Sequence, residues 1–218
     1  MSTLDVILFV PMLVGAYLVG AVPFGLVIGK AFYGVDIREH GSGNVGTTNA
    51  FRVLGKKAGI AVLACDMLKG YVPALVASLL FGPWATIVVA SAPVAGHMYS
   101  VFLKGSGGKG IATGSAVALA LVPAIYLVVL LVWIAFLLLG RMVSLASLAA
   151  ATALAVLVFV TGQPLPYVLA AFLVLGLVVV AHRSNIDRIV HHREPRVTFP
   201  WNAKPPAVPG GGRGVQGG

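Results

Sequence analysis

The chain consists mainly of apolar runs whose lengths match the hydrocarbon thickness of a lipid bilayer. A helix needs roughly 20 residues, rising about 1.5 Å each, to cross a hydrocarbon core of ~30 Å. Runs of about that length occupy residues 4–29, 58–81, 84–103 and 142–160, and a shorter run covers 167–181. Because every backbone amide and carbonyl in lipid must find a partner within the protein, these runs favour helices. The sequence therefore predicts an all-α protein that crosses the membrane several times.

Composition supports this conclusion, because the chain lacks the polar residues that cover a soluble domain. Of its 218 residues, 59% are hydrophobic and 10% are charged, and the mean hydropathy is +0.99. Lysine and arginine number 15 against 6 aspartates and glutamates, which gives a formal net charge of +9. In a bilayer protein such an excess first orients the loops and holds the anionic leaflet. Nucleic-acid binding is not expected, since the basic residues interrupt lipid-length runs and no soluble binding fold surrounds them.

The number of spans depends on residues 111–139, a run of 29 residues interrupted by Pro123. As one helix, this run gives six spans and places the basic segment 182–218 opposite the basic loop 30–57. As two short helices around Pro123, it gives seven spans and brings all the basic segments to one side, as the positive-inside rule favours. We therefore predict seven transmembrane helices, with the N-terminus outside and the C-terminus in the cytoplasm. Neither half of 111–139 is expected to cross the bilayer fully by itself.

The predicted organisation is a single membrane-embedded domain over residues 1–196 and a tail over 197–218. The tail is rich in proline and glycine and shows no periodicity, so it is expected to be disordered. We assign it no function.

Three glycine-rich basic segments interrupt the apolar runs. They cover residues 41–57, 96–114 and 181–196, and they hold just over half of the charged residues and four of the five histidines. A membrane protein that gathers Ser, Asn, His, Arg, Lys and Gly between its helices is expected to hold a polar site at the membrane surface. Anions are the expected ligands, because glycine-loop amides and basic side chains bind them.

The first segment begins GSGNVGTTN at residue 41 and combines glycines with short polar side chains. The side chains that would add contacts to a bound anion are Ser42, Asn44, Thr47, Thr48 and Asn49. Arg52 follows Asn49 by one helical turn, so it would lie beside the same site. The alternative is a glycine-rich turn in which Thr48 or Asn49 caps a helix toward Arg52. Five hydrogen-bonding side chains at a membrane boundary exceed what a turn requires, which favours a binding site.

The second segment contains KGSGGKG at 104–110, just before an apolar run. A glycine-rich backbone with lysine at a helix N-terminus is a general arrangement for holding phosphate. It is not a Walker loop, because GxxxxGK[ST] is absent, no strand precedes it and no acidic magnesium ligand follows. A nucleotide is therefore not expected.

The third segment places His182 and Asn185 three residues apart at the end of the last span, so they are predicted to share a helix face. His191 and His192 are adjacent rather than four residues apart, and no second acidic cluster accompanies them, so no metal site is predicted. A solvated basic tail is the simpler interpretation of residues 188–196.

Two polar features lie inside the apolar runs and allow two interpretations each. Asp66 and Lys69, three residues apart in the run 58–81, either form an ion pair inside the bundle or line the site. His97, at the end of the next run, either caps a helix or takes part in the site.

Together the three segments resemble the motifs of the bacterial acyl-phosphate:glycerol-3-phosphate acyltransferases, integral membrane enzymes of phosphatidic acid synthesis. SGNVGTTNAFRVLGKK is similar to the first motif of that family, FLKGSGGKGIATG to its second, and HRSNIDRI with Glu194 to its third. The resemblance covers about residues 1–196. In two places the chain departs from the family. Gly105 and Ser106 stand where a bulky and a basic residue are usual, and Ala181 and His192 stand where glycine is usual.

The resemblance implies transfer of a fatty acyl group from acyl phosphate to the 1-hydroxyl of glycerol 3-phosphate, giving lysophosphatidic acid and phosphate. It also implies a site on the cytoplasmic face of the bacterial inner membrane, and no metal, cofactor, coenzyme A or acyl carrier protein. Acyl phosphate is a mixed anhydride with a good leaving group, so the protein mainly has to bring two anions together and stabilise charge. The leading alternative is an anion channel or carrier, which would need a polar path to the outer face. The outer linkers 82–83 and 161–166 carry no charge.

The expected roles follow from the motif positions. The predicted catalytic residues are Ser42, Arg52, His182 and Asn185, and the predicted substrate-binding residues are Asn44, Thr47, Asn49, Lys104, Gly107, Gly108, Lys109, Gly110 and Glu194. Arg52 and Lys109 are the expected phosphate cations, with Lys104 in reserve, and the amides of 107–110 would hold the glycerol phosphate. The acyl tail would remain in a groove between helices, open to lipid. Activation of the attacking hydroxyl stays open between a Ser42–His182 relay, a substrate phosphate acting as base, and a covalent acyl-Ser42 intermediate.

Overall fold

The computed structural model of the chain describes residues 3–198, and every regular element in that range is helical. The helices are α1 (Thr3–Ala21), α2 (Phe24–Tyr33), α3 (Thr47–Leu54), α4 (Lys56–Leu80), α5 (Pro83–Met98), α6 (Ile111–Leu121), α7 (Pro123–Gly140), α8 (Val143–Val160), α9 (Leu165–Ala181) and α10 (Arg183–Val190), with two short 3-10 turns, η1 (Ile37–Glu39) and η2 (Val101–Leu103). The predicted all-α class is confirmed. The prediction of a disordered tail over 197–218 falls, from residue 199 onward, outside the described residues.

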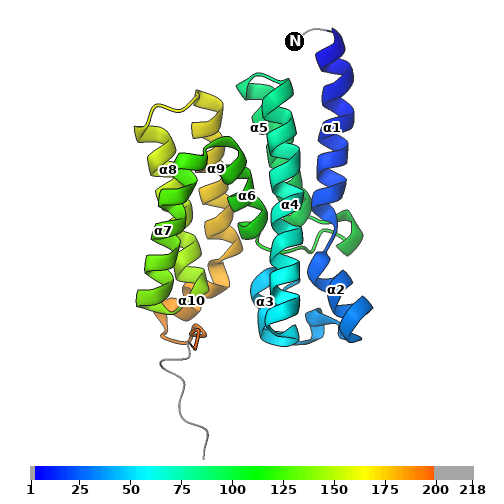
Figure 1. Cartoon of the computed structure of the whole chain (residues 1–218). Coiled ribbons are helices and arrows are strands. Elements are labelled where there is room, and N and C mark those ends of the chain that lie inside the picture. The colour runs from blue at the N-terminus through cyan, green and yellow to red at the C-terminus, as the bar shows by residue number, and fades with distance from the viewer. Residues whose placement is uncertain (1–2, 199–218) are drawn as a thin grey trace, which may run out of the picture.

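The helices form two groups that lie side by side, with α6 between them (Figure 1). In the first group α1 packs against α5, and α4 packs against both α5 and α3. In the second group α8 packs against α7 and α9. Since α6 packs against both α4 and α7, it connects the two groups.

Within the described residues, four helical segments are long and apolar enough to cross a membrane: α4, α5 extended to Leu103, α7 and α8. The pairs α1–α2 and α9–α10 are bent by 47° and 62°, and the number of candidate spans rises to six if each pair is one span. The remaining predicted span is α6, which has 11 residues. The protein is therefore an all-α multi-pass membrane protein with four to six candidate spans, and the seven-span topology stays a prediction.

The predicted break near Pro123 is confirmed, since α6 ends at Leu121 and α7 begins at Pro123. The expectation that neither half crosses the bilayer alone is wrong for α7. Its 18 residues make it one of the candidate spans. At about 1.5 Å per residue, a helix of that length is close to the hydrocarbon thickness.

The run 4–29, expected to be one span, is instead the bent pair α1–α2, and the bend lies at Val22 and Pro23. Proline has no N–H to donate and disfavours the helical conformation of the residue before it. The bend leaves backbone carbonyls without helical partners, and one side chain from the loop after α5 and one from α4 donate hydrogen bonds to them. Ser100 Oγ donates to Ala21 O at 2.6 Å, and Lys69 Nζ donates to Val22 O at 3.0 Å. The loop after α5 consequently lies level with the α1–α2 bend rather than at the end of the bundle (Figure 1).

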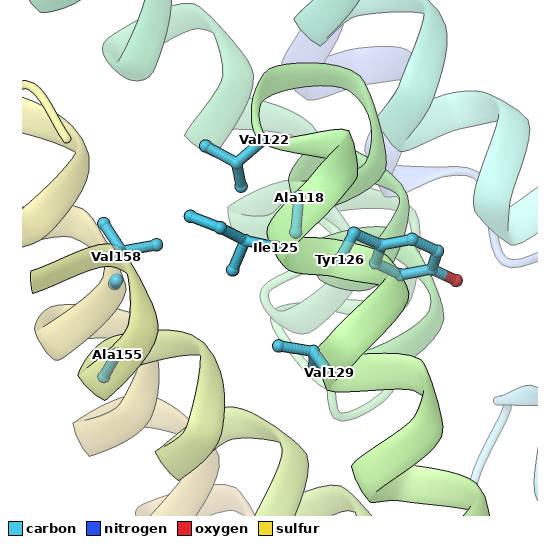
Figure 2. Packing of buried hydrophobic residues seen from close by; sticks show 8 residues of the cluster. Ala118, Val122, Ile125, Tyr126, Val129, Ala155 and Val158 are labelled. Carbon is cyan, nitrogen blue, oxygen red and sulfur yellow. The ribbon is translucent and has the colours of Figure 1, made fainter. Parts of the chain in front are cut away.

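A buried apolar cluster holds the second group together. Figure 2 shows Ile125 and Val129 of α7 facing Ala155 and Val158 of α8, with Ala118 of α6 above them. Ala171 of α9 completes the cluster. Because this packing fixes α9 against α8 and α7, it also fixes the end of α9, where the third motif begins.

Candidate active site

A cavity of about 350 Å³ opens between the loop of the first motif and the loop after α5. Its lining residues are Arg38, Ser42, Gly43, Asn44 and Val45 from the first loop, and Leu103, Ser106 and Gly107 from the second. Ser42, Asn44 and Gly107, three of the predicted site residues, therefore face one space. The first and second motifs, which are far apart in the sequence, meet at this cavity.

The loop that carries Ser42 is shaped by the buried side chain of Asn49, in the first turn of α3. Asn49 Oδ1 accepts the backbone N–H of Ser42 at 2.9 Å. Its Nδ2 donates to Ile37 O at 2.9 Å and to His40 O at 3.1 Å. Since both ends of this amide are engaged with the backbone, we assign Asn49 to positioning Ser42 and not to contacting substrate. The alternative in which Thr48 or Asn49 caps the helix is not realised, because α3 is capped by Gly46 without a side-chain hydrogen bond.

Of the two predicted substrate-binding residues Asn44 and Thr47, Asn44 lines the cavity and Thr47 does not. Asn44 Oδ1 accepts the N–H of Gly46 at 2.9 Å, and its side chain lines the cavity. The Thr47 hydroxyl is buried and has no hydrogen-bond partner among residues 3–198. A buried hydroxyl without a partner costs free energy, and Thr47 is not among the residues that line the cavity, so its role in substrate binding stays a prediction.

The cations in and just before the first motif are arranged differently from the prediction. Arg52 is exposed on α3, beside Gly41, and does not line the cavity. Arg38, which the sequence did not single out, does line it. Arg38 is paired with Asp36 through Nε–Oδ1 at 2.9 Å and Nη2–Oδ2 at 2.6 Å. The hydrogen bond from Arg38 holds the pKa of Asp36 far below its ordinary value, so this pair stays ionised.

Two backbone amides of the second motif form hydrogen bonds within the turn that follows α5. The N–H of Gly107 donates to Met98 O at 3.0 Å, and the N–H of Gly108 donates to His97 O at 2.9 Å. The prediction that these two amides hold a phosphate is not supported, because they close the turn after α5. Gly110, with φ of 75°, precedes α6 in the left-handed conformation that glycine adopts readily. Lys104 is exposed.

The second and third motifs meet in a hydrogen-bonded network. Lys109 Nζ donates to Asn185 Oδ1 of α10. Asn185 Nδ2 donates to Glu194 Oε1 at 2.6 Å. Glu194 also accepts from Ser144 Oγ and from Arg188 Nε, each at 2.7 Å. Three predicted residues, Lys109, Asn185 and Glu194, are thereby joined across the two groups of helices.

The charges in this network have perturbed pKa values. Burial opposes ionisation of Glu194, but the hydrogen bonds from Ser144, Asn185 and Arg188 outweigh it and hold the pKa of Glu194 below its ordinary value. The stability that Glu194 contributes is therefore present at neutral pH and is lost as the pH falls through that lowered pKa. Burial lowers the pKa of Lys109, and the nearby Glu194 only partly offsets it. An ammonium that is poorly solvated gains more from a bound anion than an exposed one does.

His182 lies at the bend between α9 and α10 and is buried. Its Nδ1 lies 2.9 Å from Val178 O. Because a carbonyl only accepts, Nδ1 carries the proton and Nε2 presents a lone pair. His182 and Asn185 were predicted to share one helix face, whereas the bend places His182 just before α10 and Asn185 within it. Among the described residues no hydrogen bond joins Ser42 to His182, so the relay remains a hypothesis.

Two members of the network were missed by sequence reasoning. Ser144 stands in the first turn of α8, and a single serine in an apolar helix carries no signal of its own. Arg188 lies three residues after Asn185 on α10, a spacing that places two side chains on one helix face and that would have identified it. His192 stands where the family usually has glycine, and its φ of 55° is the left-handed conformation that favours glycine. No group of three or more His, Cys, Asp or Glu side chains within the described part of the chain is placed to hold a metal ion.

Comparisons with known proteins identify the family of the chain. A family model described as glycerol-3-phosphate acyltransferase matches residues 10–192. The chain belongs to this family. The glycerol-3-phosphate acyltransferase of Geobacillus kaustophilus is 44% identical over 85% of this chain and 94% of its own length. That of Aquifex aeolicus is 45% identical over 83% of this chain and 95% of its own.

Solved structures lead to the same family. The crystal structure of PlsY, an integral membrane glycerol 3-phosphate acyltransferase, in its glycerol 3-phosphate form has a TM-score of 0.84 and 43% identity, covering 87% of this chain and 96% of that one. The lysophosphatidic acid form has a TM-score of 0.82 and 42% identity. The resemblance inferred from the three motifs is confirmed, and the site described above belongs to a membrane acyltransferase.

Proposed function

We propose that this glycerol-3-phosphate acyltransferase takes its acyl group from acyl phosphate and transfers it to the 1-hydroxyl of glycerol 3-phosphate. Production of lysophosphatidic acid follows from the family to which the chain belongs. The choice of donor and hydroxyl is our extension. The observation that carries it is the network in which Lys109 of the glycine loop meets Asn185 and Glu194, within electrostatic reach of His182.

In the proposed reaction, the hydroxyl oxygen of glycerol 3-phosphate attacks the acyl carbon of the donor. The bond from that carbon to the phosphate oxygen breaks, and inorganic phosphate leaves with the electron pair. The hydroxyl proton passes to His182 Nε2 or to a phosphate oxygen. Lys109 supplies positive charge to the phosphates, and Arg52 adds to it by closing onto the site from its exposed position on α3. The Ser42 hydroxyl positions the acceptor. Acyl phosphate brings a good leaving group and glycerol 3-phosphate brings the nucleophilic hydroxyl. Positioning of the two substrates and stabilisation of charge therefore account for the catalysis.

The donor class gives a direct prediction. The described site offers cations and hydrogen-bond donors for phosphate, and the proposal assigns no role to coenzyme A or acyl carrier protein. Purified protein supplied with glycerol 3-phosphate should therefore form lysophosphatidic acid from acyl phosphate and not from acyl-coenzyme A. The measurement is product formation from each donor at equal concentration. Equal rates with both donors would contradict the assignment of donor class.

We also propose that residues 1–196 form one domain with seven spans, in which α6 is the short span and the site faces the cytoplasm. The bacterial cytoplasmic membrane is the proposed location. The uncharged turn at Gly82 and Pro83 and the uncharged linker before α9 would lie outside, which satisfies the positive-inside rule.

The topology is testable with fused reporters. Reporters placed after Gly55, Gly110 and Pro195 should all read cytoplasmic, because basic segments flank each position, and one at Gly82 should read external. The measurement is the paired activity of a cytoplasm-specific and a periplasm-specific reporter. An external signal at Pro195, with the first two still cytoplasmic, would restore the six-span arrangement.

A further inference from the structure

A second polar cluster lies inside the first group of helices, away from the network around Glu194. It consists of Asp66 and Lys69 on α4 and His97 near the end of α5, which are 1%, 3% and 7% exposed. Lys69 Nζ lies 2.7 Å from Asp66 Oδ1, and His97 Nδ1 lies 3.6 Å from the same oxygen. Ionisable groups buried in a membrane bundle are expensive, so such a cluster calls for a role beyond packing.

Two members of the cluster hold separate segments of backbone. Lys69 Nζ donates to Val22 O, the carbonyl released by the α1–α2 bend. His97 holds the glycine loop twice. Its carbonyl accepts the N–H of Gly108, and its Nε2 lies so close to Gly108 that a Cβ at that position would overlap it. The cluster thus connects the bend between α1 and α2 to the glycine loop.

The residue after Gly108 is Lys109, whose ammonium reaches Asn185 on the other group of helices. The position of the loop backbone at Gly108 therefore decides where Lys109 can reach. We propose that Asp66, Lys69 and His97 form a positioning unit that holds the glycine loop so that Lys109 meets Asn185 and the bound phosphate. This inference rests on the proposed function, and it resolves the two interpretations of Asp66, Lys69 and His97 in favour of a positioning role.

The overlap at Gly108 provides the central experiment, a double-mutant cycle between Gly108→Ala and His97→Ala. With His97 present, the added methyl group collides with the imidazole and displaces the loop, so Gly108→Ala should raise the KM for glycerol 3-phosphate about tenfold and lower kcat less. With His97→Ala, the imidazole is gone, and the same substitution should raise the KM about threefold or less. The measured quantity is the ratio of these two effects.

Gly107→Ala is the matched comparison. A Cβ at Gly107 would overlap the backbone carbonyl oxygen of His97, which remains when the side chain is removed. Its effect on the KM should therefore be the same in both backgrounds. An equal effect of Gly108→Ala in both backgrounds would show that the imidazole does not hold the loop, and would overturn the proposal.

The ion pair is tested with the double substitution Asp66→Asn with Lys69→Met, which leaves no unpaired buried charge. It should raise the KM for glycerol 3-phosphate about tenfold. Thr86→Val is the control, since the buried Thr86 hydroxyl joins α5 to Ala77 O and Phe81 O far from the loop, at 3.1 and 3.0 Å. This control should lower the unfolding temperature and leave the KM unchanged. A folded double variant with the wild-type KM would also overturn the proposal.

Failure of the proposed function can be told apart from failure of this inference. If the wild-type protein forms no lysophosphatidic acid from acyl phosphate, the proposed function fails. The double-mutant cycle can then be measured through the unfolding temperature in detergent. Gly108→Ala should lower that temperature less in the His97→Ala background than in the wild-type background. Equal losses of stability would contradict the positioning role whatever the reaction.

Discussion

Replacing His182 with alanine should lower kcat about a thousandfold, since general-base catalysis by a positioned side chain contributes roughly a hundred- to ten-thousandfold. The physical reason is the orientation of the ring. The Nδ1–H of His182 is held by Val178 O, which leaves the Nε2 lone pair to accept the proton of the attacking hydroxyl. The measurement is the steady-state rate of lysophosphatidic acid formation at saturating substrates.

His191→Ala is a matched control for this prediction. His191 Nδ1 also lies against the carbonyl four residues earlier, at 2.8 Å from Asp187 O, but the side chain is exposed. Its removal should leave kcat within about twofold, the range of a surface substitution. A wild-type kcat for His182→Ala would assign the base to a substrate phosphate instead.

Ser42 separates the remaining mechanisms. Ser42 lines the cavity and its backbone is held by Asn49, so Ser42→Ala should abolish most of kcat while the fold remains intact. In the Ser42→Cys variant, an acyl thioester trapped on the introduced thiol would support a covalent route. If Ser42→Ala keeps the wild-type kcat, the first motif is only a loop and its catalytic assignment is wrong.

Replacing Lys109 with methionine should lower kcat/KM by roughly a hundredfold, because a charge-assisted contact in a partly desolvated site is worth about 3 kcal/mol. The loss combines two effects in one residue. The ammonium would contact phosphate, and it also donates to Asn185, so its removal breaks the hydrogen bond that joins the glycine loop to α10. The measurement is kcat/KM for each substrate in turn.

Lys57→Met is the control for Lys109, because Lys57 is exposed in the first turn of α4 and outside the cavity. Arg52→Ala is the informative comparison. If Arg52 closes onto a phosphate from its exposed position on α3, its loss should also approach a hundredfold. If Arg52→Ala lowers kcat/KM by less than about threefold, the cations that act at the site are Lys109 and Arg38. Activity of Lys109→Met equal to that of Lys57→Met would show that the network does not hold substrate.

The sequence alone predicted the features of this protein that depend on local properties of a segment. The apolar runs predicted the helices α4, α5, α7 and α8, because hydropathy and length are properties of a single segment. Pro123 predicted the break between α6 and α7 for the same reason, and Pro23 carried the same signal for the bend between α1 and α2. The three motifs identified the family and most of the polar residues that gather near the site.

Only the tertiary structure decided which partner each polar group uses. Asn49 has the chemistry of a substrate ligand, yet it holds the loop of Ser42 because Ile37 O and His40 O lie within its reach. The amides of Gly107 and Gly108 are engaged by the end of α5, and Ser144 becomes part of the site because the chain after α10 returns Glu194 to it. The sequence by itself determined which segments are apolar and long enough to be candidate spans, and which donors and acceptors are available. Their use depends on contacts between distant segments, since a hydrogen bond is made or lost within a few tenths of an ångström, and only packing sets distances to that precision.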